Sequence, residues 1–198
     1  MGSITEISEL NVRGIYSYAD YLLWLFQDRV ELIKGHIRKM SPSPSRAHQS
    51  IGGVLHREIS YFLKNKSGNV FFAPFDVRLP RLKNQLRDEQ IFDVVQPDIC
   101  VVCNPSILDD KGCLGAPDIM IEIVSPSSIK HDVETKFLLY QEAEVQEYWI
   151  VFPTDKAIQQ FILQEGKFVL KAILTHDAVL TTSILEGFEL NVKEVFEK

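Results

Sequence analysis

Two short apolar runs that each carry a carboxylate constrain the fold of this chain more than any other feature. Residues 95–102 contain Asp98, and residues 117–125 contain Asp118 and Glu122 among Ile, Met and Val. Such nearly continuous apolar runs predict central strands that are covered on both faces. A buried carboxylate costs free energy unless it is paired, hydrogen-bonded or bound to a metal. Two such acids on neighbouring core strands therefore indicate a metal site.

Strand geometry indicates which of the acids can meet. Asp118 and Glu122 share one face of a strand but lie about 13 Å apart, at a rise of about 3.3 Å per residue. Asp98 lies on a different strand, and adjacent strands are only about 4.8 Å apart. We therefore expect Asp98 and Glu122 to converge as metal ligands. Asp118 is better placed to cap the start of its strand or to support the site from behind.

A lysine follows on a predicted helix over residues 132–143. Val133, Lys136, Phe137 and Tyr140 follow the i, i+3, i+4, i+7 spacing of one helical face. Glu134 points about 200° away from Lys136, so these two cannot serve one point. On the strand itself, the position two residues after Glu122 is the apolar Val124. Lys136 is thus the expected cation, and two acids plus one lysine suit metal-assisted phosphodiester hydrolysis.

Composition limits the alternatives. The chain has 198 residues, 45% hydrophobic and 24% charged, which predicts one globular domain over residues 1–198 with a core at about 30–163. Its net charge of −6 argues against a large nonspecific grip on nucleic acid, although Arg78, Arg81, Lys83 and Arg87 form a local cationic stretch. Three cysteines, an odd number, and the lack of a signal-like N-terminus or an apolar span predict a cytoplasmic protein with no membrane partner.

Pattern reading along the chain predicts an α/β fold. The expected order is helix, strand, strand, strand, helix, strand: a mixed sheet flanked by helices, with an N-terminal helix and hairpin and C-terminal strands appended. The predicted helices cover residues 17–26, 46–64 and 132–143, and a hairpin turns at Lys34–Gly35 within residues 30–40. The predicted strands cover 69–79, 95–102, 117–125, 147–152 and 158–163. Loops are expected at 41–45, 80–93 and 104–116.

Two further residues are candidates on weaker grounds. His48 falls on the apolar stripe of the helix over 46–64, in phase with Leu55 and Ile59, where a histidine can be either a core residue or part of a site. Glu31 precedes the hairpin turn and can act as a third acid or be a surface glutamate.

These stretches together resemble a known family. The chain resembles the Uma-two family of restriction-endonuclease-like proteins, within the PD-(D/E)xK nuclease superfamily, over roughly residues 16–163. The matching stretches are residues 31–35, Ser41–Pro42 with His48, 96–98, 116–118, 122–127, Lys136 with Tyr140, and 145–149. The resemblance implies a restriction-endonuclease-like core in which Asp98 and Glu122 bind metal and the catalytic lysine has moved from the strand to Lys136. It also supports accessory roles for Glu31 and His48, and Asp118 and Tyr140 are further accessory candidates.

The sequence therefore predicts a Mg²⁺-dependent endonuclease that hydrolyses DNA, with Mn²⁺ as an alternative ion. Hard cations favour carboxylate and water oxygens. Because nucleases of this kind often act on two strands, a homodimer is expected. The main alternative is a catalytically silent module of the same fold that binds nucleic acid or protein. A third interpretation is a metal-dependent hydrolase that acts on another phosphate ester. The wider superfamily has lysine at the position of Val124, and this difference keeps the silent module open as an alternative.

Overall fold

The chain forms two compact units that interleave along the sequence. The computed structural model describes residues 4–40, 44–82, 84–126 and 129–197. The first unit comprises residues 1–42, 75–96 and 107–116, and the second comprises 43–74, 97–106 and 117–198. Ser41, Pro42, Lys83 and Ser127 lie outside the described residues. One domain over 1–198 stays a prediction, since two compact units can also be parts of a single domain.

The first unit is a small sheet with short helical turns. Its strand order is β2-β1-β5-β4-β8-β7. The strands are β1 Val30–Ile33, β2 His36–Lys39, β4 Val77–Arg78, β5 Val94–Val95, β7 Leu108–Asp109 and β8 Gly112–Leu114. The helical turns are η1 Ile7–Glu9, α1 Tyr18–Tyr21 and η2 Asp88–Gln90, while η3 Pro105–Ile107 lies where the chain passes back from the second unit.

The second unit is built on a six-stranded mixed sheet in the order β12-β11-β10-β9-β6-β3, with β13 and β14 as a separate pair. The strands are β3 Asn69–Phe72, β6 Ile99–Val102, β9 Ile119–Ile123, β10 Glu147–Phe152, β11 Ala157–Gln164, β12 Lys167–Leu174, β13 Val179–Thr181 and β14 Glu189–Asn191. The helices are α2 Arg46–Leu63, the π-helical η4 His131–Lys136, α3 Phe137–Glu142 and α4 Val192–Phe196.

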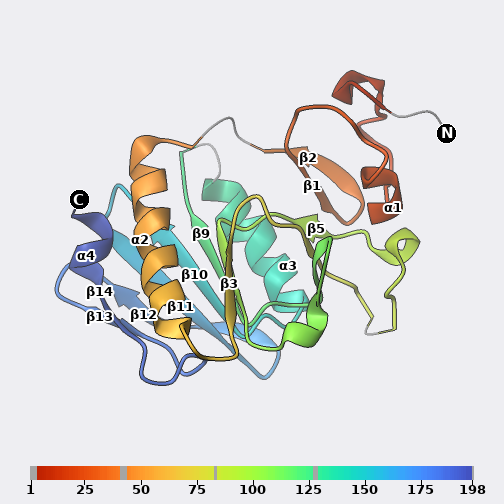
Figure 1. Cartoon of the computed structure of the whole chain (residues 1–198). Coiled ribbons are helices and arrows are strands. Elements are labelled where there is room, and N and C mark those ends of the chain that lie inside the picture. The colour runs from red at the N-terminus through yellow and green to blue at the C-terminus, as the bar shows by residue number, and fades with distance from the viewer. Residues whose placement is uncertain (1–3, 41–43, 83, 127–128, 198) are drawn as a thin grey trace. The chain divides into compact units, whose positions relative to one another are not determined.

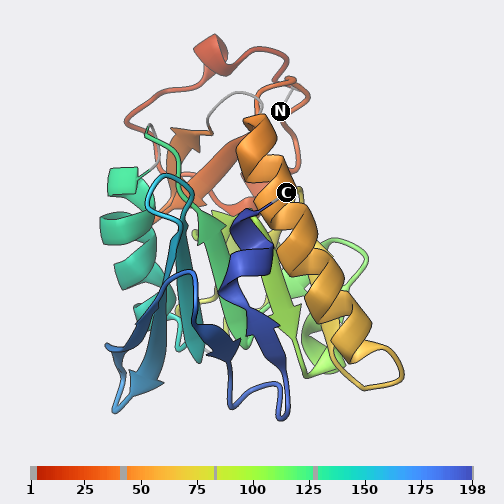
Figure 2. The same ribbon diagram turned by 90° about the vertical axis from the view of Figure 1, so that its left-hand side faces the viewer.

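The predicted element order is confirmed in this second unit, which runs α2, β3, β6, β9, α3, β10 along the chain. β3 and β6 are antiparallel, as are β6 and β9, whereas β9 and β10 are parallel. Helix α2 covers one face of the sheet and α3 covers the other (Figures 1 and 2). This is the mixed sheet flanked by helices that the sequence predicted.

Alternation along β9 decides what each face of the sheet carries. Ile119, Ile121 and Ile123 pack in the core beneath α2 together with Leu55 and Ile59 of that helix. Because successive side chains of a strand point to opposite faces, Met120 and Glu122 are directed to the side of α3. The one carboxylate of this strand is therefore presented to the second helix.

Helix α2 approaches the sheet closely at Gly52. A Cβ atom at this position would lie 3.0 Å from the ring of Phe72 and 3.2 Å from Cδ1 of Ile123. The missing side chain thus lets the first half of α2 lie close to the C-terminal end of β9, and this half carries His48.

Several predicted elements differ from the structure. The predicted strand over 69–79 is two strands, β3 and β4, which belong to different sheets because the chain changes sheet at Ala73–Pro74. The run 95–102 likewise divides into β5 and β6, with Asp98 just outside β6. The helix expected over 132–143 begins with a π-helical turn.

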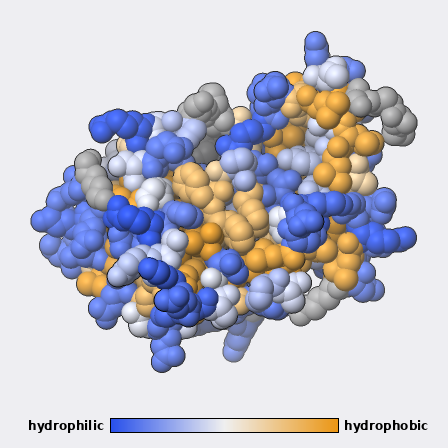
Figure 3. Space-filling view, viewed as in Figure 1, coloured by the Kyte–Doolittle hydropathy of each residue, from blue (hydrophilic) through white to orange (hydrophobic). Residues whose placement is uncertain are grey.

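The N-terminal helix is also shorter than predicted. The capping box of Ser17 and Asp20 starts α1 as expected, but the helix ends at Tyr21. Leu22, Leu23 and Leu25 are exposed instead of forming a helical stripe. Figure 3 shows the resulting apolar surface in the region of α1.

Candidate active site

Glu122 lies at the centre of the candidate site. Its Oε1 atom accepts hydrogen bonds from Nζ of Lys136 at 2.8 Å and from the hydroxyl of Tyr140 at 2.7 Å. All three side chains are buried, with Glu122 and Lys136 each 3% exposed and Tyr140 fully enclosed. The carboxylate is thereby held in one position by an ammonium group and a phenol.

Lys136 and Tyr140 reach Glu122 from one helical face. Lys136 ends the π-helical turn η4, and Tyr140 follows four residues later in α3, so both side chains lie on the side facing the sheet. Glu134 is exposed, whereas Lys136 is buried. The prediction that Glu134 and Lys136 point apart is therefore confirmed.

Asp98 lies one step beyond the ladder between β6 and β9. The antiparallel register pairs Ile99 with Ile121 and Cys100 with Met120, so its continuation places Asp98 opposite Glu122. The Oδ2 atom of Asp98 accepts a hydrogen bond from the backbone N–H of Ile123 at 2.8 Å. This bond fixes the carboxylate at the amide that directly follows Glu122.

His48 is the second partner of Asp98. Its Nε2 atom lies 3.1 Å from Oδ2 of Asp98, and its side chain is mostly buried in the first turn of α2. Burial opposes the charged imidazolium, but the hydrogen bond and the negative charge of Asp98 outweigh burial, so the pKa of His48 is raised above its usual value. The buried Nδ1 atom makes no hydrogen bond of normal geometry with the described residues.

The structure thus brings the predicted residues together in two clusters. One is Asp98 with His48, and the other is Glu122 with Lys136 and Tyr140. The clusters meet on β9, because Asp98 bonds the amide of Ile123 and Glu122 is the preceding residue. Within the described residues, no three His, Cys, Asp or Glu side chains form a group able to hold a metal ion. Convergence of Asp98 and Glu122 on one ion stays a prediction.

Asp118 lies at the other end of the strand and does not join these contacts. Its Oδ2 atom accepts a hydrogen bond from the backbone N–H of Cys103 at 2.6 Å. This bond ties the end of β6 to the start of β9. Burial raises the pKa of the Cys103 thiol to about 11, and the charge of Asp118 adds to this shift. Asp118 therefore acts at the start of β9, which is one of the two roles that the sequence predicted for it.

Glu31 belongs to the first unit, and its contacts within that unit are as follows. It lies on β1, is 2% exposed, and accepts a hydrogen bond from the backbone N–H of Gln96 at 3.0 Å. Gln96 in turn accepts hydrogen bonds from Arg29 through its side-chain oxygen. Glu31 is therefore a buried, hydrogen-bonded acid rather than a surface glutamate.

Sequence reasoning missed one residue of the site, Asp132. This acid is 3% exposed, and its Oδ1 atom lies 3.8 Å from Nζ of Lys136. The signal was present in the sequence, because Asp132 precedes Lys136 by four residues and such pairs face each other on a helix.

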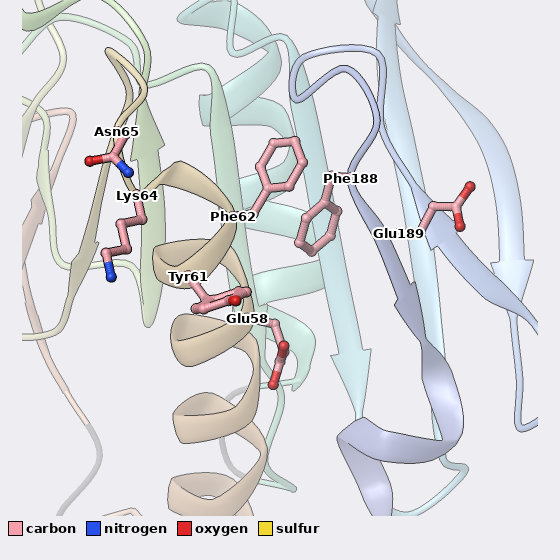
Figure 4. A pocket seen from close by; sticks show the side chains of 7 residues that line it. All are labelled: Glu58, Tyr61, Phe62, Lys64, Asn65, Phe188 and Glu189. Atoms are coloured by element: carbon pink, nitrogen blue, oxygen red, sulfur yellow. The ribbon is translucent and has the colours of Figure 1, made fainter.

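A cavity of about 640 Å³ lies elsewhere on the second unit. Helix α2 and the two residues that follow it line one side with Glu58, Tyr61, Phe62, Lys64 and Asn65, and Phe188 and Glu189 complete the lining. Figure 4 shows the rings of Phe62 and Phe188 next to each other, in an edge-to-face contact, while Lys64 and Asn65 point away from Glu189. Its polar side chains do not converge on one point, and none of the predicted site residues lines it.

In the described part of the chain, no helix combines the length and apolar character needed to cross a membrane.

Comparison with known proteins gives a matching family and similar solved structures. A family model named Uma2, described as "Putative restriction endonuclease", matches residues 18–193. The chain is also similar to a crystal structure from Anabaena variabilis ATCC 29413, described as a "putative nuclease belonging to DUF820". That match has a TM-score of 0.71 and 20% identity, and it covers 91% of this chain and 97% of the other. A comparison with curated proteins gives no match.

The structural match establishes a shared fold, and the family match extends over most of the sequence. Both agree with the mixed sheet and the element order of the second unit. This chain belongs to the Uma2 family of restriction-endonuclease-like proteins.

Proposed function

We propose that this protein is a metal-dependent endonuclease that hydrolyses phosphodiester bonds in DNA. The observation that carries this proposal is the contact of a buried carboxylate, Glu122, with the ammonium group of Lys136, beside a second acid at the opposite register position, Asp98. These are the residue types that such hydrolysis requires.

The donor set fits Mg²⁺ better than a metal that needs many protein ligands. Mg²⁺ is commonly held by one or two carboxylates, and waters and substrate phosphate oxygens complete its shell. Asp98 and Glu122 supply two carboxylates, which agrees with the lack of a three-residue metal group among the described residues. When bound, the ion would lower the pKa of a water molecule and polarise the scissile phosphate.

The chain's own residues have separate tasks in this proposal. Lys136 places a positive charge beside Glu122, where it would stabilise the negative charge that develops on the phosphate. Tyr140 fixes the orientation of the Glu122 carboxylate, and His48 together with the amide of Ile123 fixes that of Asp98. Glu31 stays an accessory acid in this proposal.

One observation favours a second function, a catalytically silent module of the same fold. Val124 is buried at the strand position that carries lysine in the wider superfamily. An ion pair between Glu122 and Lys136 can also serve stability alone. A silent module would neither bind Mg²⁺ at these acids nor cut DNA.

A cleavage assay tests the proposal. Supercoiled plasmid and single-stranded DNA are incubated with the protein and Mg²⁺ or Mn²⁺, and we expect metal-dependent cutting that Asp98→Ala abolishes. Asp118→Asn is the matched control, because it removes an acid at the start of β9, the end of that strand far from Glu122, and retains an acceptor for the backbone N–H of Cys103. Cutting by Asp98→Ala at the wild-type rate would refute the assigned site.

Metal affinity gives a second test that does not depend on activity. In calorimetry with Mn²⁺, alanine at Asp98 or at Glu122 should each weaken binding at least tenfold, about 1.4 kcal/mol. If both variants bind Mn²⁺ as the wild type does, these acids are not its ligands.

A homodimer is part of the same proposal. Strand β12 ends the large sheet, and Val169, Leu170 and Ile173 on it are exposed. Edge strands with exposed apolar side chains can pair with a second chain. Solution scattering measures the molecular mass over a wide concentration range. A mass that stays at that of one chain would refute the homodimer.

A further inference from the structure

Asp132 is a buried acid to which the proposed mechanism gives no task. Its side chain is 5% exposed, and its Oδ1 atom lies 3.8 Å from the ammonium group of Lys136. The Lys136 side chain is 4% exposed and lies 2.8 Å from Glu122. The ammonium group therefore lies between two buried carboxylates, one on the strand and one on its own helical turn.

The turn that carries both residues is anchored to the neighbouring strand. The hydroxyl of Tyr148 donates a hydrogen bond of 2.9 Å to the backbone carbonyl of Asp132, and this contact is buried. Tyr148 belongs to β10, which pairs in parallel with β9. The strand beside Glu122 thus holds the turn that delivers Lys136 to Glu122.

The backbone of the turn before Lys136 has an unusual conformation. Residues 131–136 form a π-helical turn, a rare conformation that is found mostly as single turns and frequently at functional sites. The ring of Tyr148 also packs edge-on against that of Tyr140, at 5.1 Å between centroids and 88° between planes. Tyr148 therefore contacts both the turn before Lys136 and the second donor to Glu122.

We propose that Asp132 and Tyr148 are positioning residues that hold the ammonium group of Lys136 at Glu122. Lysine has a flexible four-carbon stem, so a single ion pair leaves its ammonium group several positions. The carboxylate of Asp132 removes this freedom from the side chain, and Tyr148 removes it from the backbone. For its effect on cleavage, this inference rests on the proposed function.

The experiment first measures the position of the ammonium group without any reaction. In protein labelled with ¹⁵N-lysine, a buried, hydrogen-bonded ammonium group exchanges its protons slowly enough to give a resolved NMR signal. Lys136→Met identifies that signal by deleting it. We expect Asp132→Asn to broaden or displace the signal. Glu134→Gln should leave it unchanged, because it removes one negative charge from the exposed side of the same turn.

The second measurement is steady-state cleavage of DNA. Asp132→Asn should lower kcat by about tenfold or more and leave KM within about twofold, because a misplaced catalytic group affects the chemical step. Asp132→Glu should restore part of the loss, since it returns the carboxylate. Tyr148→Phe should lower kcat less than Asp132→Asn does.

The outcomes separate this inference from the proposed function. An unchanged Lys136 signal in Asp132→Asn overturns the positioning role, whether or not the protein cuts DNA. A wild type that does not cut DNA but shows the expected changes in the signal refutes the proposed function and supports the positioning role. If Asp132→Asn does not fold, Tyr148→Phe is measured instead, because it leaves every charge in place. A Lys136 signal that is unchanged in Tyr148→Phe then overturns the positioning role.

Discussion

The ammonium group of Lys136 lies 2.8 Å from Oε1 of Glu122, and both side chains are about 4% exposed. The two residues are separated by 14 positions and come from a π-helical turn and a central strand. Each of these two buried charges is stabilised by the opposite charge of the other. Removing one partner of a buried pair leaves the other uncompensated.

This dependence predicts a large loss of stability in Lys136→Met. The variant should unfold with a free energy lower by about 3–5 kcal/mol in urea, because it leaves Glu122 charged and buried. Adding Glu122→Gln should recover most of the loss. Lys130→Met, at an exposed position nearby, is the control and should change little. A double variant less stable than Lys136→Met would show that the two residues do not form the pair described.

Tyr140→Phe should also destabilise the protein, by about 2 kcal/mol. The variant removes only the hydroxyl that donates to Glu122, and hydrogen bonds to charged groups contribute about 1.5–3 kcal/mol. Tyr61→Phe, at a residue that is 76% exposed, provides the comparison. Equal unfolding curves for the two variants would argue that the hydroxyl of Tyr140 contributes no more than a solvent-exposed one.

His48 should make stability depend on pH. Its pKa is raised from 6.5 in the folded state because the hydrogen bond and the charge of Asp98 outweigh burial. A raised histidine pKa stabilises the fold fully below the ordinary value, and this contribution is lost as the pH rises through the raised pKa. In metal-free buffer, wild type should therefore exceed His48→Gln in stability by more at pH 6 than at pH 9.

The control for this measurement is the same substitution at the exposed His36, which should show a smaller change with pH. A difference between wild type and His48→Gln that is constant from pH 6 to pH 9 would contradict an ion pair between His48 and Asp98.

Cys103 should react slowly with iodoacetamide. Burial and the neighbouring Asp118 raise the pKa of its thiol from 9.0 to about 11, and the thiolate is the reactive form. At pH 8 the alkylation rate should be about a hundredfold below that of an ordinary cysteine. Asp118→Asn should accelerate alkylation severalfold, as followed by mass spectrometry of the Cys103 peptide. No acceleration would mean that burial alone protects this thiol.

Much of the fold follows from local patterns in the sequence. The helix predicted over 46–64 is α2, Arg46–Leu63, because its apolar residues keep a helical spacing throughout. The predicted hairpin is β1 and β2, with Lys34 and Gly35 at φ values of 54° and 78° in the turn. The breaks within 69–79 and 95–102 were not predictable in this way, because the apolar pattern continues while the chain changes sheet.

The candidate site was predictable where face geometry decides it. The separation of Glu134 from Lys136, and the pairing of Lys136 with Glu122, follow from which side of a strand or helix each residue occupies. Asp132 was missed because only the apolar residues and the lysine of that face were considered. The π-helical turn could not be predicted, because an apolar pattern of i, i+3 and i+4 does not distinguish it from an ordinary helical turn.

The interleaving of the two units has a consequence for how this protein can be cut or rebuilt. The chain passes between the units at residues 42–43, 74–75, 96–97, 106–107 and 116–117. A truncation anywhere between residues 43 and 116 therefore removes part of both units, so neither unit can be expressed as one uninterrupted fragment. Gln96 and Pro97 flank one of these crossings, and Asp98 is the next residue. A gene fusion or a split-protein design that must preserve the site is thus confined to the two chain ends or to the continuous segment that follows Glu122, Lys136 and Tyr140.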